Sequence, residues 1–360
     1  MGRPKKEDKA VKTSISKGQD AAKLAVQESV LQKYDYLFSQ IPDRKANLFS
    51  TGIPSLDHAL GGGLPRGQFV HLYGKQGAGK STLAQHLAAE ALKEQARYCY
   101  IDPENTIDKT LASKLGLSIT DPRSYIHKYP NAEVVLDAVE EFVKTGIYSI
   151  IIFDTIAALA SRKILESSNE DDNIGIKSRM MSKACEKLNH AIVQNDCIIL
   201  FVNQLRANIS PMPNAPKTTT PGGETIKFYA NINIGMSQLK RIVDPTTDVV
   251  IGQEVIVKIE KNKIAAPHKE VILSLIYGDG FRKDYDLINS AINEGIVNQA
   301  GSWFKYNGES IGQGMRGMLD YASKQPQWLD ELETKLYGNI ESEVSGSNSE
   351  QDAEVITVHA

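Results

Sequence analysis

The 360-residue sequence has few of the features that would place a protein outside the reducing interior of a cell. Three scattered cysteines, Cys99, Cys185 and Cys197, are too few for a disulfide framework or a zinc site. No segment approaches the ~20 consecutive apolar residues that a membrane-spanning helix requires, and no apolar signal core stands near residue 1. We therefore predict a cytoplasmic protein that does not contact a membrane.

The chain also lacks a strong net charge. Its formal charge is −3 and its pI is near 6.2, so a nucleic-acid partner would have to be bound by local patches or loops. The two ends differ in sign, because residues 1–20 are rich in Lys and Arg whereas residues 338–360 contain five acidic residues and no Lys or Arg. Such compositions are typical of disordered segments, and we predict a basic arm and an acidic tail.

One segment carries the strongest functional signal. The stretch Gly74-Lys75-Gln76-Gly77-Ala78-Gly79-Lys80-Ser81 has the spacing of a phosphate-binding loop. Its glycines let backbone N–H groups turn toward phosphates, its last lysine counters phosphate charge, and the adjacent hydroxyl can hold Mg²⁺. The apolar run 69–73 predicts a strand before the loop, and residues 82–93 predict a helix that begins at Thr82. The sequence therefore predicts a site for a nucleoside triphosphate.

Polar side chains follow three other apolar runs of the chain. Asp154 ends the run 149–153, where an aspartate can hold the Mg²⁺ of a bound nucleotide. Glu104 comes just after the run 98–102 and could align and deprotonate an attacking water. Gln204 follows a third run, where a neutral amide can sense the terminal phosphate without adding charge. These residues predict an NTP-hydrolysing site.

The distribution of apolar residues predicts the fold class. From residue 49 to 280, strand-like runs alternate with helical patterns, which indicates an α/β core with a mostly parallel sheet covered by helices. We expect strands at 69–73, 98–102, 147–154, 197–203, 231–236 and 253–261. Residues 281–337 change to a small mixed domain rich in Gly and aromatics, and residues 21–40 have the pattern of an amphipathic helix.

Two long polar segments follow strands of the predicted core. Residues 163–173 come after the strand that bears the predicted metal ligand, and residues 207–223 come after Gln204 and are rich in Pro and Thr. Stretches of this length without regular structure are usually functional or disordered. Beside a phosphate site they favour a polymer ligand whose binding depends on the nucleotide. Lys261 and Lys263 end a later strand, where they would either lie on a solvated edge or complete a neighbouring subunit's site.

Together these segments resemble the RecA family of homologous-recombination proteins over about residues 49–335. The resemblance rests on these ordered blocks: Ser50–Asp57, Gly74–Ser81, Ile101–Glu104, Phe153–Asp154, Arg179–Ser182, Asn203–Arg206, Thr218–Gly223, Lys227–Ala230, Lys261–Pro267, Tyr277–Gly278 and Ile311–Gly314. It implies an ATP-dependent recombinase that forms a helical filament on single-stranded DNA. This filament would exchange strands with homologous double-stranded DNA, with hydrolysis stimulated by DNA.

The resemblance also implies roles for individual residues. ATP would be held by the loop residues 74–82 and Asp108, while Lys261 and Lys263 would reach across the filament interface to the neighbour's ATP and Tyr277 would lie near its adenine. Catalysis would rest on Lys80, Glu104 and Gln204, and Mg²⁺ would be bound by Ser81 and Asp154. Single-stranded DNA would contact Arg179, Ser182, Lys183, Arg206, Ile209, Gly222 and Gly223, with Ile209 wedged between base triplets. Lys227 and Phe228 would face the adjoining subunit, on which the segment 21–48 would also dock.

Two departures from the family pattern keep other interpretations open. Leu111 stands where the family usually places an aromatic side chain over adenine, and Glu186 replaces a family arginine. The alternatives are a hexameric DNA helicase or motor on the same fold, and an ATP-switched DNA-binding regulator with little hydrolysis. Single-strand-binding and mediator proteins would be further partners of a recombinase.

Overall fold

The computed structural model describes residues 47–166, 175–207, 218–219, 224–244 and 247–338, together with Lys33. The predicted basic arm, the helix predicted at 21–40 apart from Lys33, and the acidic tail from 339 onward lie outside the described residues. So do residues 167–173 of the first predicted loop and residues 208–217 and 220–223 of the second. Lys33 is helical.

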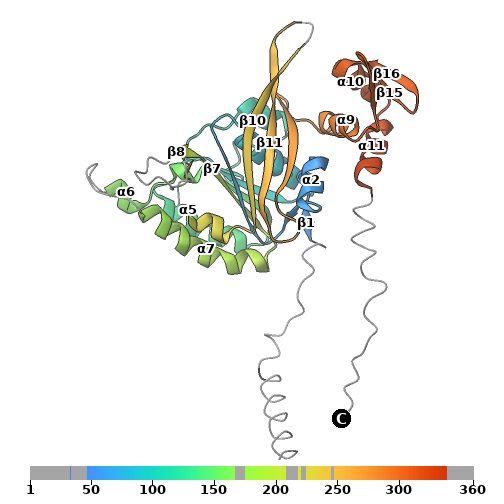
Figure 1. Cartoon of the computed structure of the whole chain (residues 1–360). Coiled ribbons are helices and arrows are strands. Elements are labelled where there is room, and N and C mark those ends of the chain that lie inside the picture. The colour runs from blue at the N-terminus through green and yellow to red at the C-terminus, as the bar shows by residue number, and fades with distance from the viewer. Residues whose placement is uncertain are drawn as a thin grey trace, which may run out of the picture. The chain divides into compact units, whose positions relative to one another are not determined.

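A nine-stranded sheet forms the centre of the described chain, in the order β13-β12-β11-β10-β3-β7-β6-β4-β5 (Figure 1). The strands are β3 (Phe69–Gly74), β4 (Arg97–Ile101), β5 (Tyr125–Ile126), β6 (Tyr148–Asp154), β7 (Ile198–Gln204), β10 (Ile232–Val243), β11 (Val250–Asn262), β12 (Lys269–Ile276) and β13 (Gly280–Phe281). Neighbours from β10 to β5 pair in parallel, whereas β10 to β13 pair antiparallel. The predicted α/β class with a mostly parallel sheet is confirmed.

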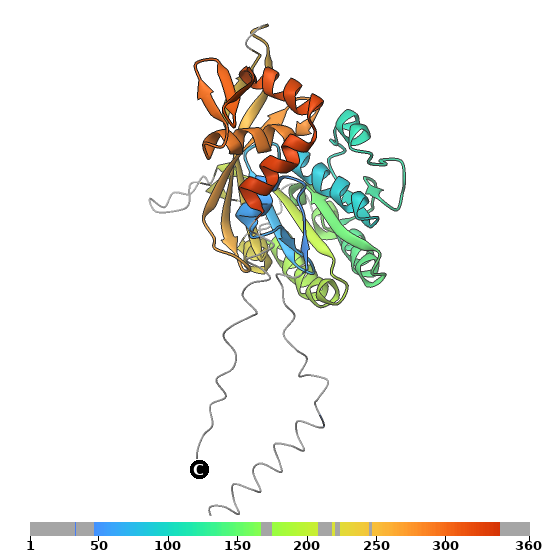
Figure 2. The ribbon, with the colours of Figure 1, turned by 90° about the vertical axis from the view of Figure 1, so that its right-hand side faces the viewer.

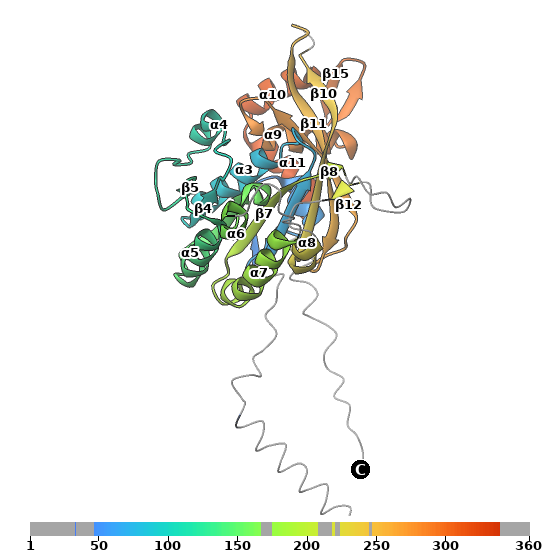
Figure 3. The same cartoon turned by 90° about the vertical axis from the view of Figure 1, so that its left-hand side faces the viewer.

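Helices cover both faces of this sheet, because its central strands are apolar on both sides. One face packs against α2 (Pro54–Leu60), α3 (Lys80–Lys93) and α4 (Lys109–Lys114), and the other against α5 (Ala132–Lys144), α7 (Ile176–Gln194) and α8 (Glu224–Tyr229) (Figure 3). Helix α5 shows why such a segment folds locally. The Asn131 side chain accepts a hydrogen bond from the backbone N–H of Val134 at 3.1 Å, and five apolar residues at helical spacing face the core.

Residues after the sheet form a smaller unit with its own core. It consists of α9 (Lys283–Asn293), β14 (Asn298–Ala300), β15 (Trp303–Tyr306), β16 (Glu309–Gln313), α10 (Gly314–Lys324) and α11 (Gln327–Tyr337) (Figure 2). Trp328 and Leu332 lie at the centre of this second core. The buried Asp286 carboxylate accepts hydrogen bonds from the backbone N–H of Ser55 at 2.9 Å and from its hydroxyl at 2.5 Å. These bonds join α9 to α2 of the sheet layer.

Short elements complete the described chain, and two of them bear on the predicted loops. These elements are β1 (Leu48–Phe49), β2 (Leu64–Pro65), a 3₁₀ turn (Ile156–Ala158), α6 (Arg162–Glu166), β8 (Arg206–Ala207) and β9 (Thr218–Thr219). Strands β8 and β9 pair antiparallel, so they bring two parts of the segment 207–223 together. Helix α6 includes the first residues of the segment 163–173. In the described part of the chain, no helix is long and apolar enough to cross a bilayer.

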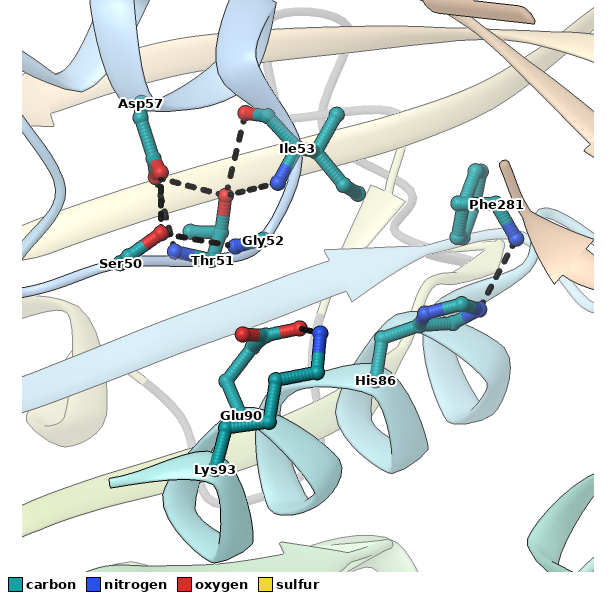
Figure 4. Close-up of polar contacts among 9 residues, drawn as sticks. All are labelled: Ser50, Thr51, Gly52, Ile53, Asp57, His86, Glu90, Lys93 and Phe281. Atoms are coloured by element: carbon teal, nitrogen blue, oxygen red, sulfur yellow. Dashed lines mark hydrogen bonds and ion pairs between the residues drawn. The ribbon is translucent and has the colours of Figure 1, made fainter. Parts of the chain in front are cut away.

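Two polar contacts fix the layer of α2 and α3 (Figure 4). The Asp57 carboxylate accepts hydrogen bonds from the Ser50 hydroxyl at 2.6 Å and from the backbone N–H and hydroxyl of Thr51 at 2.8 and 2.6 Å. On α3, Nε2 of His86 accepts a hydrogen bond from the backbone N–H of Phe281 at 2.9 Å. Hydrogen bonds to the Asp57 carboxylate therefore hold the turn of Ser50 and Thr51 against the start of α2.

Candidate nucleotide-binding site

The segment between β3 and α3 has the backbone of a phosphate-binding loop. Gly77 and Gly79 have φ values of 75° and 84°, a left-handed conformation that favours glycine. Gly79 then caps the N-terminus of α3, so the positive end of the helix dipole faces the loop. The Lys80 ammonium donates a hydrogen bond to the Lys75 carbonyl at 2.8 Å and is held over the loop.

A hydroxyl and a carboxylate meet beside this loop. The Asp154 side chain, only 5% exposed, accepts a 2.5 Å hydrogen bond from the Tyr100 hydroxyl and is also hydrogen-bonded to Ser81. Both oxygen donors are of the kind that Mg²⁺ prefers when water and phosphate oxygens complete its shell. The predicted pair therefore fits the ion, and Tyr100, which sequence reasoning missed, orients the carboxylate.

The protonation equilibria of this site follow from its burial. Burial lowers the pKa of Lys80, and the charges of Asp154 and Glu104 oppose this shift. Burial raises the pKa of Asp154, and hydrogen bonds from Tyr100 and Ser81 oppose that shift. A bound phosphate group would favour the charged form of the lysine.

The two acidic residues that follow β4, Asp102 and Glu104, have different roles. The buried Asp102 carboxylate accepts hydrogen bonds from the backbone N–H groups of Thr106 and Ile107 at 2.8 and 3.0 Å, and so holds the loop after the strand. This leaves Glu104 exposed, with Oε1 accepting a 3.0 Å hydrogen bond from the Thr155 hydroxyl. The predicted base is thus oriented by a side chain on the neighbouring strand's end.

A single cavity of about 670 Å³ connects these groups. Its lining combines Gln76, Gly77, Gly79, Lys80, Ser81, Thr82, Glu104, Thr106, Asp154, Thr155, Gln204, Gln238, Arg241, Gln253, Leu275 and Tyr277. All three predicted catalytic residues and both predicted metal ligands are among them. This convergence arises because β3, β4, β6 and β7 are parallel, so their carboxyl ends meet at one edge of the sheet. The lining residues on β10, β11 and β12, namely Gln238, Arg241, Gln253 and Leu275, were not predicted, whereas Tyr277, which follows β12, was.

Comparison with known protein families shows which family the chain belongs to. A model described as the RecA N-terminal domain matches residues 28–282, and one described as the RecA C-terminal domain matches residues 285–341. The chain belongs to the RecA family. The predicted identity as a RecA-family recombinase and DNA-dependent ATPase is therefore confirmed. ATP binding, which is common to the family, is confirmed with it.

Individual RecA proteins are similar over most of their length. The chain is 37% identical to Protein RecA of Azospirillum lipoferum over 82% of this chain and 81% of that protein. It is 36% identical to Protein RecA of Cytophaga hutchinsonii, over 87% and 86% of the two chains, and 38% identical to Protein RecA of Bartonella quintana, over 80% and 82%.

Several residues to which the RecA resemblance gives a nucleotide role do not line the cavity. Asp108 accepts hydrogen bonds from the backbone N–H groups of Thr110 and Leu111 and caps α4. Leu111, at the family's aromatic position, is only 3% exposed and packs into the core. Lys261 pairs with Asn233, while Gly74 pairs with Met236 further along β10. The lysine therefore lies away from the carboxyl edge that bears the phosphate loop.

The residues predicted to contact DNA or a neighbouring subunit are only partly described. Arg179 and Lys183 are exposed on α7, and the Ser182 hydroxyl is hydrogen-bonded to the Thr225 hydroxyl at 3.2 Å. Arg206 lies in β8, while Ile209, Gly222 and Gly223 lie outside the described residues.

On α8, Phe228 is 74% exposed, although most aromatic side chains among the described residues are buried. The Lys261 ammonium donates hydrogen bonds to the carbonyls of Lys227 and Phe228 at 2.9 and 3.2 Å. The Lys263 ammonium donates to the Asn231 side chain at 3.3 Å. Lys227, Phe228, Lys261 and Lys263 therefore come close together at one place on the surface.

Proposed function

We propose that the chain assembles into a helical filament on single-stranded DNA with ATP bound at the loop of residues 74–82. The filament would pair this strand with homologous duplex DNA, and hydrolysis would release the product. The observation that carries the proposal is the meeting of Lys80, Ser81, Glu104, Asp154 and Gln204 in one cavity of a RecA-family chain. The phosphate contacts of such a filament would make its DNA affinity fall with salt.

The residues of the cleft support in-line attack of water on the terminal phosphate. Backbone N–H groups of the loop and the Lys80 ammonium would bind the outer phosphates and stabilise the charge that develops on them. When Mg²⁺ is bound by Ser81 and Asp154, it neutralises phosphate charge. Glu104, held by the Thr155 hydroxyl, would orient the water and accept its proton.

Gln204 would couple the terminal phosphate to the DNA-binding segment. Its backbone pairs with Gly74 at the start of the phosphate loop, and its side chain lines the cavity. Strand β8, which begins two residues later, pairs with β9 inside the segment 207–223. A shift of Gln204 on phosphate binding would therefore act on the backbone that leads to Ile209, Gly222 and Gly223.

The cluster of Lys227, Phe228, Lys261 and Lys263 supports a role at the filament interface. An exposed aromatic side chain next to cations suits burial against a second copy of this chain. The two lysines would then reach the phosphates held by the neighbour, since they lie away from the cleft of their own protomer. Tyr277 remains on the wall of its own cleft.

The remaining parts of the proposal concern organisation and partners. The chain would comprise an arm (1–20), an oligomerisation segment (21–48), an ATPase core (49–280), a C-terminal domain (281–337) and an acidic tail (338–360). Arg179, Ser182, Lys183 and Arg206 would add DNA contacts. Single-strand-binding and mediator proteins would be partners in a cytoplasmic location.

Steady-state ATP hydrolysis with and without single-stranded DNA tests the proposal, with Lys80→Ala as the inactive control. A filament predicts strong stimulation by DNA that rises cooperatively with protein concentration. Stimulation without this cooperativity would instead support a ring-shaped motor. Tight ATP-dependent DNA binding without hydrolysis would indicate a nucleotide switch and would contradict the catalytic assignment of Glu104.

A further inference from the structure

The cleft has a second wall that the phosphate-binding residues do not use. The loop, the acids and Gln204 occupy the end where phosphates and Mg²⁺ belong. The second wall is built by three antiparallel strands and by the residue that follows the last of them; its residues are Gln238, Arg241, Gln253, Leu275 and Tyr277. Since the loop would hold the outer phosphates, we expect the nucleoside half of a bound nucleotide to lie along this wall.

The strand register places an arginine on this wall. Arg241 lies opposite Gln253, which in turn lies opposite Leu275, so these side chains form a row across β10, β11 and β12. A register shift between Gln238 and Lys240 leaves Leu239 without a partner. In a regular ladder Lys240 would lie opposite Gln253 and Arg241 would point to the other face. Because of the bulge, Arg241 shares the face of Gln238 and lines the cavity.

The rest of the row is fixed to the phosphate loop. The Gln253 side-chain amide donates a 2.7 Å hydrogen bond to the Gly77 carbonyl. Leu275 lies so close to Gly79 that a Cβ atom built there would be 2.7 Å from its Cδ1. The turn after Tyr277 is held by the Lys114 ammonium, which contacts the Gly278 carbonyl at 2.6 Å and the Asp279 carboxylate at 2.8 Å. Arg241 therefore projects from a wall whose neighbouring residues Gln253 and Leu275 contact the phosphate loop.

We propose that Arg241 binds the nucleoside half of the nucleotide in its own protomer and sets affinity for the base and ribose. A guanidinium group is planar, so it can stack on a base while it donates hydrogen bonds to ring nitrogens or ribose hydroxyls. Leu275 offers an apolar contact and Tyr277, which is 53% exposed, offers a second flat surface. The buried Leu111 cannot supply such a surface. This inference rests on the proposed ATP binding and deepens it.

Nucleotide binding to the full-length chain, measured by calorimetry with Mg²⁺ and without DNA, tests the inference. The probes are ATPγS, ADP and inorganic tripolyphosphate. We expect Arg241→Ala to weaken ATPγS and ADP by a similar factor of ~10 and to leave tripolyphosphate unchanged. In hydrolysis assays, KM for ATP should rise while kcat stays within about twofold of wild type.

Lys240→Ala is the matched control, because Lys240 lies on the opposite face and forms an ion pair with Glu254 at 3.1 Å. An equal loss in this control, or no loss in Arg241→Ala, would overturn the inference. A loss confined to ATPγS and tripolyphosphate would place the guanidinium on the terminal phosphates and would also overturn it. Failure of the wild-type chain to bind any probe would contradict the proposed function itself, which separates the two outcomes.

Discussion

The two ends of the nucleotide cleft are built in different ways. The phosphate end consists of one contiguous motif and of residues at the tips of parallel strands, where the topology brings them together. The nucleoside end consists of single residues from three antiparallel strands, which are brought together by register and by one bulge. A motif can be recognised in sequence, whereas a register depends on pairing partners far along the chain.

The two ends also differ in burial, and this sets the expected size of mutational effects. Lys80 is 6% exposed and its pKa is lowered by burial, so its charge acts in a medium of low polarity. Arg241 is exposed to solvent, which screens its interactions. Substitutions at the phosphate end should therefore abolish ATP hydrolysis, while those at the nucleoside end should change the affinity for the nucleotide.

The largest effect is expected for Lys80→Ala. Removal of the buried ammonium leaves the outer phosphates without their main side-chain cation, and the rate of ATP hydrolysis should fall by at least ~10²-fold. Lys75→Ala is the control, because Lys75 has an exposed side chain and contributes its backbone carbonyl to the loop. Initial-rate assays at saturating DNA compare the two, and similar losses in both variants would show that loop folding, rather than the Lys80 charge, is responsible.

Glu104→Gln should separate binding from chemistry at the same end. The amide keeps the shape of the side chain but cannot accept a proton, so kcat should fall by ~10²- to 10⁴-fold. ATPγS affinity should remain within about threefold of wild type, because Glu104 is not part of the phosphate loop. A comparable loss of ATPγS affinity would assign the carboxylate to ground-state binding instead.

Thr155→Val tests a positioning residue with a smaller effect. Loss of the 3.0 Å hydrogen bond to Glu104 frees the carboxylate to rotate, and kcat should fall by ~10-fold with KM unchanged. Thr155→Ser retains the hydroxyl and should restore most of the rate. If the serine variant is as slow as the valine variant, packing of the methyl group, rather than the hydrogen bond, matters.

The last prediction concerns stability rather than catalysis, in the layer of α2 and α3. Burial raises the pKa of Asp57 to about 6, with hydrogen bonds from Ser50 and Thr51 opposing it. The stability gained from the protonated acid is complete below pH 3.8 and is lost as pH rises to about 6. Burial lowers the pKa of His86 to about 4, so its contribution is complete above pH 6.5 and is lost as pH falls to about 4.

Each pKa shift changes the free energy of unfolding by roughly 3 kcal/mol. As pH rises through nearly the same window, the contribution of Asp57 falls while that of His86 rises. These two contributions to the free energy of unfolding should therefore cancel in the wild-type chain. Asp57→Asn removes the contribution of Asp57, which in the wild-type chain is lost as pH rises. The free energy of unfolding of this variant, relative to wild type, should therefore increase by about 2–3 kcal/mol between pH 4 and 6.5. Denaturant unfolding at both pH values measures this difference. A constant difference between variant and wild type would mean that Asp57 titrates normally in the folded chain.

Sequence reasoning anticipated the phosphate end and the strands that bear it because each signal is local. Glycine spacing predicts the loop, and an acid after an apolar run predicts a strand tip at the carboxyl edge. The same reasoning ended the strand of residues 231–236 too early, because Ser237 and Gln238 interrupt the apolar pattern. In the structure β10 continues to Val243, since pairing with β11 rather than side-chain burial sustains it.

Other residues were missed because their role depends on a partner from elsewhere in the chain. Tyr100 reads as an ordinary strand residue until the parallel pairing of β4 and β6 brings its hydroxyl to Asp154. Gln253 has no motif of its own, and its amide reaches Gly77 across 176 positions of sequence.

The sequence by itself determined that this chain folds as an α/β protein and belongs with recombinases, and it predicted a nucleoside triphosphate site at residues 74–82. These properties follow from short-range chemistry, namely glycines that free backbone N–H groups and apolar runs that must be buried. Only the tertiary structure decided that Arg241 rather than Lys240 faces the cleft and that Asp102 supports a loop while Glu104 remains exposed. In each case strand register or packing across distant segments selects the side chain, and no local pattern encodes it.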